Sequence, residues 1–415
     1  MKNLWRGVLV FLLVLLLCLM LVSACSGDDD DDDDAADDDD DTADDDDDDT
    51  ADDDDDDDTA DDDDDDDDDT FPPEEQDPFI SKGLILPPDS LECIPEETGI
   101  PQLNCNHHGS AVAMLPGGTM AAVWYHGVAE KSPDSRIVWS KVEQGKEDWT
   151  WPEVLYDDPG RAEGNPTLWI GEDGTYYVFF VTIFGDGWPQ SKVRLVRSFD
   201  DGVSWTSPLM LRNEYCWMTR HRPLRLSNGE LLLPLYNECL AIPVYMRSAD
   251  DFNTWTMEPH TDLDYFLAHM GQIQPALVLL DEGRIAAITR DGLPTNRIKR
   301  ATSDDQGYTW TASLMTDLPN SGTSVDQVRL LDGHVVAVFN NSPEHRFPLS
   351  VALSHDGGES FFVIKDINNE CESPPCSYSY PSIAQNTEDG TIWVTYSYGR
   401  GTIGWVHFNE AWIIE

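Results

Sequence analysis

The stretch SFDDGVSW at 198–205 decides the fold, because its pattern returns along the chain. It recurs as SDDQGYTW at 303–310 and SHDGGESF at 354–361, and a worn copy, SADDFNTW at 248–255, has Phe252 where the others have Gly. In this pattern Gly can take a positive φ, Asp can bond back to turn amides, and the aromatic side chain can pack under a sheet. Copies about 50 to 56 residues apart, including a weaker one that ends at Trp149, predict a repeated hairpin unit.

A second repeat marks where an apolar strand begins in each unit. Its six openings are His108-Gly109, Asn165-Pro166, Arg222-Pro223, Gln274-Pro275, Asp326-Gln327 and Tyr380-Pro381. They are 57, 57, 52, 52 and 54 residues apart, and each leads into a short apolar strand, a turn that contains Gly, and a second apolar strand. Six such units, each with four short strands, predict an all-β fold, a six-bladed β-propeller over residues 105–415.

Radial repetition places the corresponding strand of every blade around one channel. The polar residues that open these strands are then expected to meet at one end of the channel, although one or two of them are expected to be strand caps. A single site can therefore collect side chains from six distant parts of the sequence.

The charge of the chain is concentrated near the N-terminus. The 415 residues contain 25 Lys and Arg against 81 Asp and Glu, for a net charge of −56, and 34 of the Asp lie between Asp28 and Asp69. The rest of the chain still carries an excess of 22 negative charges, so a basic surface for nucleic acid is excluded. The acidic tract lacks apolar residues and repels itself, which predicts a disordered tether.

The first residues indicate export. Lys2 and Arg6 precede an apolar run at 8–22 that is too short to span a membrane and is followed by small residues, as in a secretory signal. The sequence VSAC at 22–25 resembles the lipobox of bacterial lipoproteins, which implies a lipid on Cys25. We expect a signal peptide at 1–24, a lipidated tether at 25–70, a lead-in segment at 71–104, and a protein anchored to the outer membrane or surface of a bacterium.

Six cysteines remain outside the signal and the lipobox. An even number in an exported chain favours disulfides. Pairing of sequence neighbours is our preferred choice among 15 connectivities: Cys93 with Cys105, Cys216 with Cys239, and Cys371 with Cys376. Neither the cysteines nor the histidines have metal-ligand spacing, so we expect no metal and no cofactor.

The repeats and the six-bladed plan resemble the sialidase (neuraminidase) superfamily, and the resemblance covers nearly the whole chain after residue 100. Asp-boxes also occur in unrelated propellers, so the site residues have to be matched one at a time. The resemblance implies three arginines that hold a substrate carboxylate, a Tyr nucleophile activated by a Glu, and an Asp that acts as acid and base. On this basis Tyr380 matches the nucleophile, Arg290 and Arg346 match the second and third arginines, and Asp134 matches the acid/base.

Two positions depart from that pattern. His108 stands where the first arginine is expected, and Gln274 stands where the Glu partner of the tyrosine is expected. Because Gln cannot accept a proton, Tyr380 needs another activator, and Glu238, at the end of a neighbouring strand, is a candidate. Arg222 is a candidate for the missing cation, and Asn165, Gln274 and Asp326 complete the predicted binding residues.

The leading hypothesis is a monomeric exo-acting glycoside hydrolase that cleaves a terminal acidic sugar, sialic acid or a related one, from extracellular glycans. One alternative is a uronate polysaccharide lyase that uses His108 and Tyr380 while the arginines neutralise the uronate. Another is a glycan-binding surface lipoprotein without catalysis, which the two departures favour.

Overall fold

The computed structural model describes residues 71–93, 101–258, 262–371 and 376–415. The predicted signal peptide, the lipidated Cys25 and the Asp-rich tether lie outside the described residues. The chain divides into two units, and the second, Asp67–Glu415, contains every described residue. Within these ranges no helix is both long enough and apolar enough to cross a membrane.

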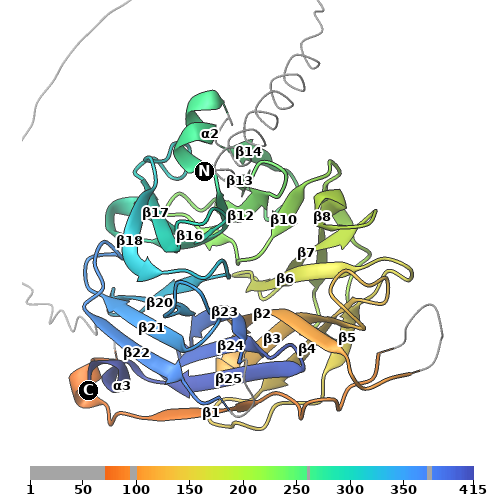
Figure 1. Ribbon diagram of the computed structural model, residues 1–415, viewed down its shortest axis with the longest axis horizontal. Coiled ribbons are helices and arrows are strands. Elements are labelled where there is room, and N and C mark those ends of the chain that lie inside the picture. Colours follow the sequence, from red (N-terminus) through yellow and green to blue (C-terminus); the bar gives the residue numbers. More distant parts are fainter. Residues whose placement is uncertain (1–70, 94–100, 259–261, 372–375) are drawn as a thin grey trace, which may run out of the picture. The chain divides into compact units, whose positions relative to one another are not determined.

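Six antiparallel sheets surround a common centre, so the prediction of a six-bladed β-propeller is confirmed (Figure 1). The first sheet contains β2 (Asn106–Met114), β3 (Met120–Gly127), β4 (Arg136–Val142) and β5 (Glu153–Tyr156). The second contains β6 (Glu163–Ile170), β7 (Tyr176–Ile183), β8 (Ser191–Ser198) and β9 (Leu209–Arg212). The third contains β10 (Trp217–Thr219), β11 (Leu224–Arg225), β12 (Leu231–Asn237), β13 (Ile242–Ser248) and β14 (Thr256–Glu258).

The second half of the chain continues the same plan. The fourth sheet contains β15 (Gln272–Leu279), β16 (Ile285–Asp291), β17 (Arg297–Ser303) and β18 (Leu314–Pro319). The fifth contains β19 (Asp326–Arg329), β20 (Val335–Asn340), β21 (Leu349–Ser354) and β22 (Val363–Asn368), and the sixth contains β23 (Tyr378–Gln385), β24 (Ile392–Tyr398) and β25 (Thr402–Phe408). The helices are short: η1 (Pro73–Glu75), η2 (Pro116–Gly118), η3 (Trp188–Gln190), α2 (Leu263–His269), η4 (Asp281–Gly283) and α3 (Glu410–Ile414).

The ring is closed by a strand from the beginning of the described unit. Strand β1 (Ile80–Leu84) pairs antiparallel with β25 and becomes the outer strand of the sixth sheet. Ile85 and Leu86, which follow it, are buried. The sequence predicts a lead-in segment at 71–104 outside the propeller, whereas β1 lies within the last blade.

A bulge opens the innermost strand of four blades. The pairing register shifts around Gly109, Asn165, Gln274 and Tyr380, and each of these residues has a positive φ, between 46° and 68°. In the first blade the equivalent residue is therefore Gly109, whereas sequence analysis opened that strand at His108. A bulge re-aims the side chain that it carries, so these four positions face a different direction from the rest of their strands.

The Asp-box turns share one hydrogen-bond pattern. In the copy at 303–310 the amide of Gly307 donates to Ser303 Oγ at 2.8 Å, and Asp305 accepts the amide and the hydroxyl of Thr309 at 2.8 and 2.6 Å. The copies at 198–204, 248–254 and 354–360 repeat these bonds. Phe252 adopts the turn with φ 61° because its buried ring packs edge-on against Phe179.

Packing between neighbouring blades supplies the core. One buried cluster joins residues of the second and third blades, and another joins residues of the fifth and sixth. A single four-stranded sheet exposes two faces, so each blade buries its apolar surface only against its neighbours. The six cysteines form Cys93–Cys105, Cys216–Cys239 and Cys371–Cys376, the pairs that sequence proximity favoured.

We expect Asp305→Asn to lower the free energy of unfolding by about 1–2 kcal/mol, because the amide replaces an ionised acceptor of several hydrogen bonds. Urea unfolding measures this loss. Asp304→Asn is the matched control, since Asp304 is the exposed neighbour of Asp305. Equal effects of the two changes on stability would contradict a structural role for the bond pattern that the four turns share.

The loss of unfolding free energy in Asp305→Asn should also depend on pH. Burial acts to raise the pKa of Asp305, but hydrogen bonds from Thr309 and Ser303 outweigh it, so the pKa is lowered. The ionised carboxylate therefore stabilises the fold above the pKa of about 3.9 that Asp has in the unfolded chain, and this contribution is lost as the pH falls. The difference between wild type and Asp305→Asn should shrink below that pH.

Candidate active site

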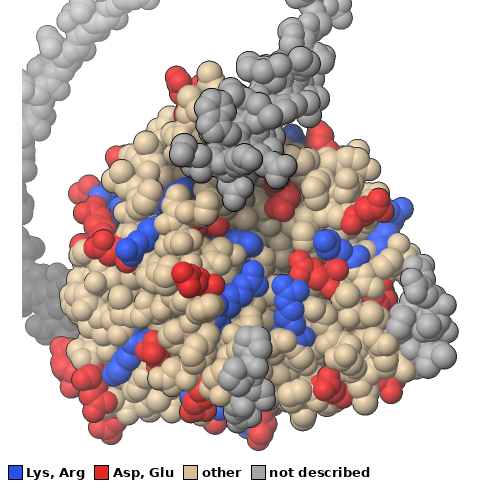
Figure 2. Space-filling view, in the orientation of Figure 1, with Lys and Arg blue, Asp and Glu red and all other residues tan. Residues whose placement is uncertain are grey.

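A cavity of about 190 Å³ opens at the end of the channel where the bulged strands begin. Every blade contributes to its wall, as the propeller geometry predicts. The lining residues are Tyr125, Glu130, Asn165, Trp188, Met218, Tyr236, Glu238, Ile273, Arg290, Arg346, Tyr380 and Arg400. Basic side chains gather near the centre of the face shown in Figure 2, with acidic side chains beside them.

Tyr380 lines the cavity and is bonded to two other residues of the site. Its hydroxyl oxygen accepts a hydrogen bond from Arg290 Nη1 at 2.8 Å and another from Gln274 Nε2 at 3.3 Å. Arg290 Nη1 also lies 3.5 Å from Gln274 Oε1, which orients the amide so that its NH₂ group faces the phenol. Gln274, which cannot act as a base, therefore acts as a donor to Tyr380.

These donors change the ionisation of Tyr380. Burial acts to raise its pKa, but the positive charges of Arg290 and Arg346 and the bond from Gln274 outweigh burial, so the pKa lies below its ordinary value. Donors and cations favour the phenolate over the neutral phenol. Tyr380 can thus be activated electrostatically, without the carboxylate that the sialidase pattern requires.

Tyr236, which lies in the same cavity, behaves in the opposite way. Its hydroxyl accepts bonds from Asn165 Nδ2 at 3.3 Å and from Gln274 Nε2 at 3.4 Å. Burial and the neighbouring Glu238 raise its pKa well above the usual value. Tyr236 therefore stays neutral, and Asn165 contributes to the site by fixing this second phenol.

Three guanidinium groups line the cavity, although sequence analysis identified only Arg290 and Arg346. The third, Arg400, lies in the turn between β24 and β25 and donates to Glu130 Oε2, whose other oxygen accepts from Trp188 Nε1 at 2.9 Å. The arginine and glutamate come from the sixth and first blades. No repeat marks Arg400, and only the closure of the ring brings these two blades together.

The carboxyl groups of the cavity are Glu130 and Glu238. Burial raises the pKa of Glu238, while Arg290 acts in the opposite direction. Asp134, the predicted acid/base, is not among the lining residues: both its oxygens accept the amide of Val128, at 3.2 and 3.0 Å. Asp134 instead closes the loop after β3, and Glu130 in that same loop reaches the cavity.

His108 lies behind Tyr380 instead of lining the cavity. Its ring centroid is 4.3 Å from that of Tyr380, and its Nδ1 is 2.8 Å from Ser397 Oγ. Burial and the charges of nearby arginines, Arg400 first among them, hold its pKa well below the usual value. The histidine is neutral and cannot replace the charge of an arginine.

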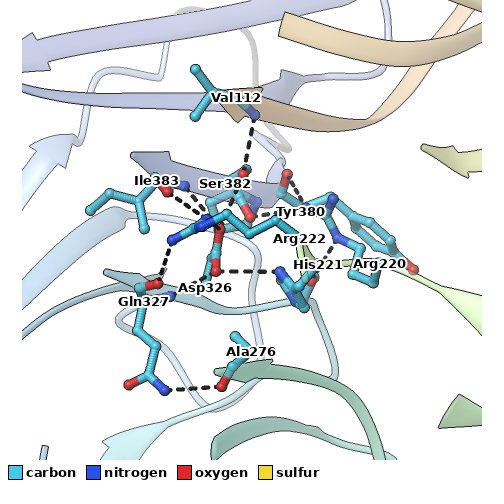
Figure 3. Close-up of polar contacts among 12 residues, drawn as sticks. Val112, Arg220, His221, Arg222, Ala276, Asp326, Gln327, Tyr380, Ser382 and Ile383 are labelled. Carbon is cyan, nitrogen blue, oxygen red and sulfur yellow. Dashed lines mark hydrogen bonds and ion pairs between the residues drawn. The ribbon is translucent and has the colours of Figure 1, made fainter. Parts of the chain in front are cut away.

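Arg222 and Asp326 are not among the residues that line the cavity, and Figure 3 shows them bonded to one another and to their neighbours. Arg222 donates to the carbonyls of Ile383 and Gln327 at 2.9 and 3.0 Å and lies 3.4 Å from Asp326. Asp326 also contacts His221 at 3.3 Å, and these charges hold its pKa well below the usual value although burial opposes them. Strand spacing located both residues but did not show to which end of the channel their side chains point.

Arg222 also lines a second cavity, of about 280 Å³, at the opposite end of the channel. A separate group, Asp332, His334 and Glu410, has the spacing of metal ligands among the described residues. None of the three lines either cavity.

The comparisons with known proteins agree with the propeller. A family described as BNR repeat-like domain matches residues 118–394. No curated protein matches the chain. A similar solved structure is a Hadza microbial sialidase, with 15% identity and a TM-score of 0.62 over 74% of this chain and 66% of that one. The NanB sialidase of Streptococcus pneumoniae has 13% identity and a TM-score of 0.61 over 74% of this chain and 69% of that one. A protein of unknown function from Dyadobacter fermentans has 16% identity and a TM-score of 0.62 over 80% of this chain and 99% of that one. At these identities the likeness establishes the fold alone.

We expect Arg290→Gln to raise the pKa of Tyr380 by at least about one unit, because it removes the nearest positive charge from the phenol oxygen. Ultraviolet titration of the phenol, after subtraction of the Tyr380→Phe spectrum, isolates this group. Arg284→Gln, an exposed change in the turn before the same strand, is the control and should leave the titration unchanged. An unshifted titration in Arg290→Gln would show that Arg290 does not set the ionisation of Tyr380.

Proposed function

The chain belongs to the BNR repeat-like domain family, and from that premise we propose that it is a sialidase-like exo-glycoside hydrolase. Its substrate is a terminal acidic sugar, sialic acid or a related one, on an extracellular glycan. The observation that carries the proposal is Tyr380, which accepts bonds from Arg290 and Gln274 and has a lowered pKa, in a cavity that also holds three arginines and two carboxyl groups. A nucleophile, an anion clamp and an acid are the groups that such a hydrolysis needs.

Arg290, Arg346 and Arg400 bind the carboxylate of the sugar. A carboxylate pairs well with guanidinium groups because their donors match its two oxygens. Arg400 supplies the cation that His108 cannot, from a different blade. Its ion pair with Glu130 keeps the guanidinium in place before substrate arrives.

Tyr380 and Glu238 carry out the reaction in two steps. The Tyr380 oxygen forms a bond to the anomeric carbon while the bond to the leaving oxygen breaks, and Glu238 donates its proton to that oxygen. Water then replaces Tyr380 on the anomeric carbon as Glu238 takes its proton, so the configuration is retained. A buried carboxyl group with a raised pKa is suited to hold the proton that the first step consumes.

We also propose that the protein is exported, acts as a monomer and is tethered to the cell surface by a lipid on Cys25, with the Asp-rich tract as spacer. This part rests on the sequence of the first 70 residues. A tethered position suits an enzyme that acts on glycans outside the cell.

Tyr380→Phe should lower kcat by at least about 10³-fold, because it removes the attacking oxygen. Turnover of fluorogenic sialosides and of a panel of acidic polysaccharides measures the loss. Tyr215→Phe, at an exposed tyrosine outside the cavity, should retain wild-type activity. Normal turnover by Tyr380→Phe would exclude the proposed nucleophile.

The same assay separates the other two functions. Products that absorb in the near ultraviolet would identify the uronate lyase, in which Tyr380 removes a proton from the sugar. Binding of glycans without any product, equal in wild type and Tyr380→Phe, would identify a binding protein.

Glu238→Gln should lose about 10²-fold or more in kcat on natural glycans but much less on aryl glycosides, whose leaving groups depart without protonation. The two classes of substrate are compared for each variant. Asp134→Asn should lower neither rate selectively, because Asp134 lies outside the cavity. Selective loss in Asp134→Asn but not in Glu238→Gln would assign the acid to Asp134 after all.

A further inference from the structure

Arg220 lies directly beneath the proposed nucleophile. It follows β10, at the break before β11, on the innermost strand of the third blade. Its side chain is 1% exposed and does not line the cavity. It is therefore hidden from any substrate and can act only through other residues.

The guanidinium group of Arg220 donates hydrogen bonds to three other blades, and Figure 3 shows it beside Tyr380. Nε donates to Ser324 Oγ at 2.9 Å, and Nη1 donates to the carbonyl of Ser110 at 2.9 Å. Nη2 donates to the carbonyls of Tyr380 and Pro381, at 3.0 and 2.9 Å. Two of the four bonds thus go to the carbonyls of the nucleophile and of the proline that follows it.

The backbone of Tyr380 needs such support. Its φ of 56° lies in the left-handed region that residues with a side chain rarely adopt. The bulge between Ser379 and Ser382 leaves Tyr380 and Pro381 outside the paired register of β23 and β24. Arg220 supplies their carbonyls with the donors that the neighbouring strand does not.

The charge of Arg220 also reaches Tyr380. Its Cζ lies 5.2 Å from the centroid of the Tyr380 ring, and its four hydrogen bonds go to uncharged oxygens. Burial lowers the pKa of Arg220, whereas the charges of Asp326 and ionised Tyr380 act to raise it. Coupling between two charges is reciprocal, so the cation beneath the ring also favours the phenolate. Among the described residues, the other titratable groups around Tyr380 are Arg290, Arg346, Arg400, His108, Glu130, Glu238, Tyr125 and Tyr236.

We infer that Arg220 is a positioning residue, which holds the strained Tyr380–Pro381 unit so that the phenol oxygen faces the cavity and which supplies a buried positive charge beneath it. This inference rests on the proposed role of Tyr380 as nucleophile. Arg290, Arg346 and Arg400 line the cavity and meet the substrate, and Arg290 also bonds the phenol. Arg220 meets no substrate and acts only on the nucleophile. The loss of Arg220 should then change kcat and its pH dependence and leave KM nearly unchanged.

Arg220→Lys is the main test, because Lys keeps the buried charge but cannot donate to all four oxygens at once. We expect kcat to fall about tenfold or more while KM changes less than about threefold. Arg222→Lys is the matched control: Arg222 lies in the same channel and also donates to backbone carbonyls, but not to those of Tyr380 or Pro381. Equal effects of the two changes on kcat would overturn the inference.

A second measurement does not depend on turnover. Arg220→Gln removes the charge, and in ultraviolet titration the phenol of Tyr380, isolated by subtracting the Tyr380→Phe background in each protein, should titrate at a higher pH than in wild type. An unchanged titration in Arg220→Gln would overturn the electrostatic part. If no glycoside is turned over but this shift is present, the proposed function fails and the support of Tyr380 by Arg220 stands.

Ser324→Ala covers the case in which replacing the buried arginine prevents folding. It removes one acceptor and leaves Arg220 in place, free to tilt away from the two carbonyls. We expect kcat to fall about threefold with unchanged KM, and Ser324→Thr to restore it because Thr retains the hydroxyl acceptor. Wild-type kcat in Ser324→Ala, with the fold intact by circular dichroism, would contradict the positioning role.

Discussion

Closure of the ring by β1 against β25 is the constraint on which the rest of the structure depends. Each sheet buries its apolar faces only between two neighbouring blades, and the first and last blades become neighbours only when the ring closes. The pairing of residues 80–84 with 404–408 supplies that closure. The same closure places Arg400 of the last blade against Glu130 of the first, so a stability requirement and a feature of the site have one origin.

The channel contains charged groups in two layers with different roles. In the upper layer three arginines face a cavity and are partly available to a ligand. In the lower layer His221 and Arg222 pair with Asp326, and Arg220 and Arg222 donate to carbonyls of the inner strands. A buried charge is tolerated only where hydrogen bonds compensate for lost water, and the carbonyls that the bulges release provide such bonds. The bulges therefore both aim the site residues and anchor the arginines beneath them.

Much of the site follows from electrostatics around one phenol. Arg290 and Gln274 donate to Tyr380, whereas Asn165 and Gln274 donate to Tyr236, where burial and Glu238 dominate. Two tyrosines in one cavity thus acquire opposite tendencies from their neighbours: one towards the phenolate and one towards the neutral phenol. The replacement of a carboxylate by Gln274 fits this arrangement, because a negative charge beside Tyr380 would oppose its ionisation.

The sequence by itself determined the propeller and the number of blades, because Asp-boxes and strand openings are local patterns that repeat at a regular spacing. The repeats also marked Tyr380, whereas Arg290 and Arg346 followed from the resemblance to the sialidase superfamily. Only the tertiary structure decided which polar residues reach the cavity. Asp134 is turned to a loop amide, Arg222 and Asp326 point down the channel, and Arg400 and Glu130 enter from loops that no repeat marks. The direction of a side chain depends on bulges, loop paths and ring closure, which are contacts between blades and leave no period in the sequence.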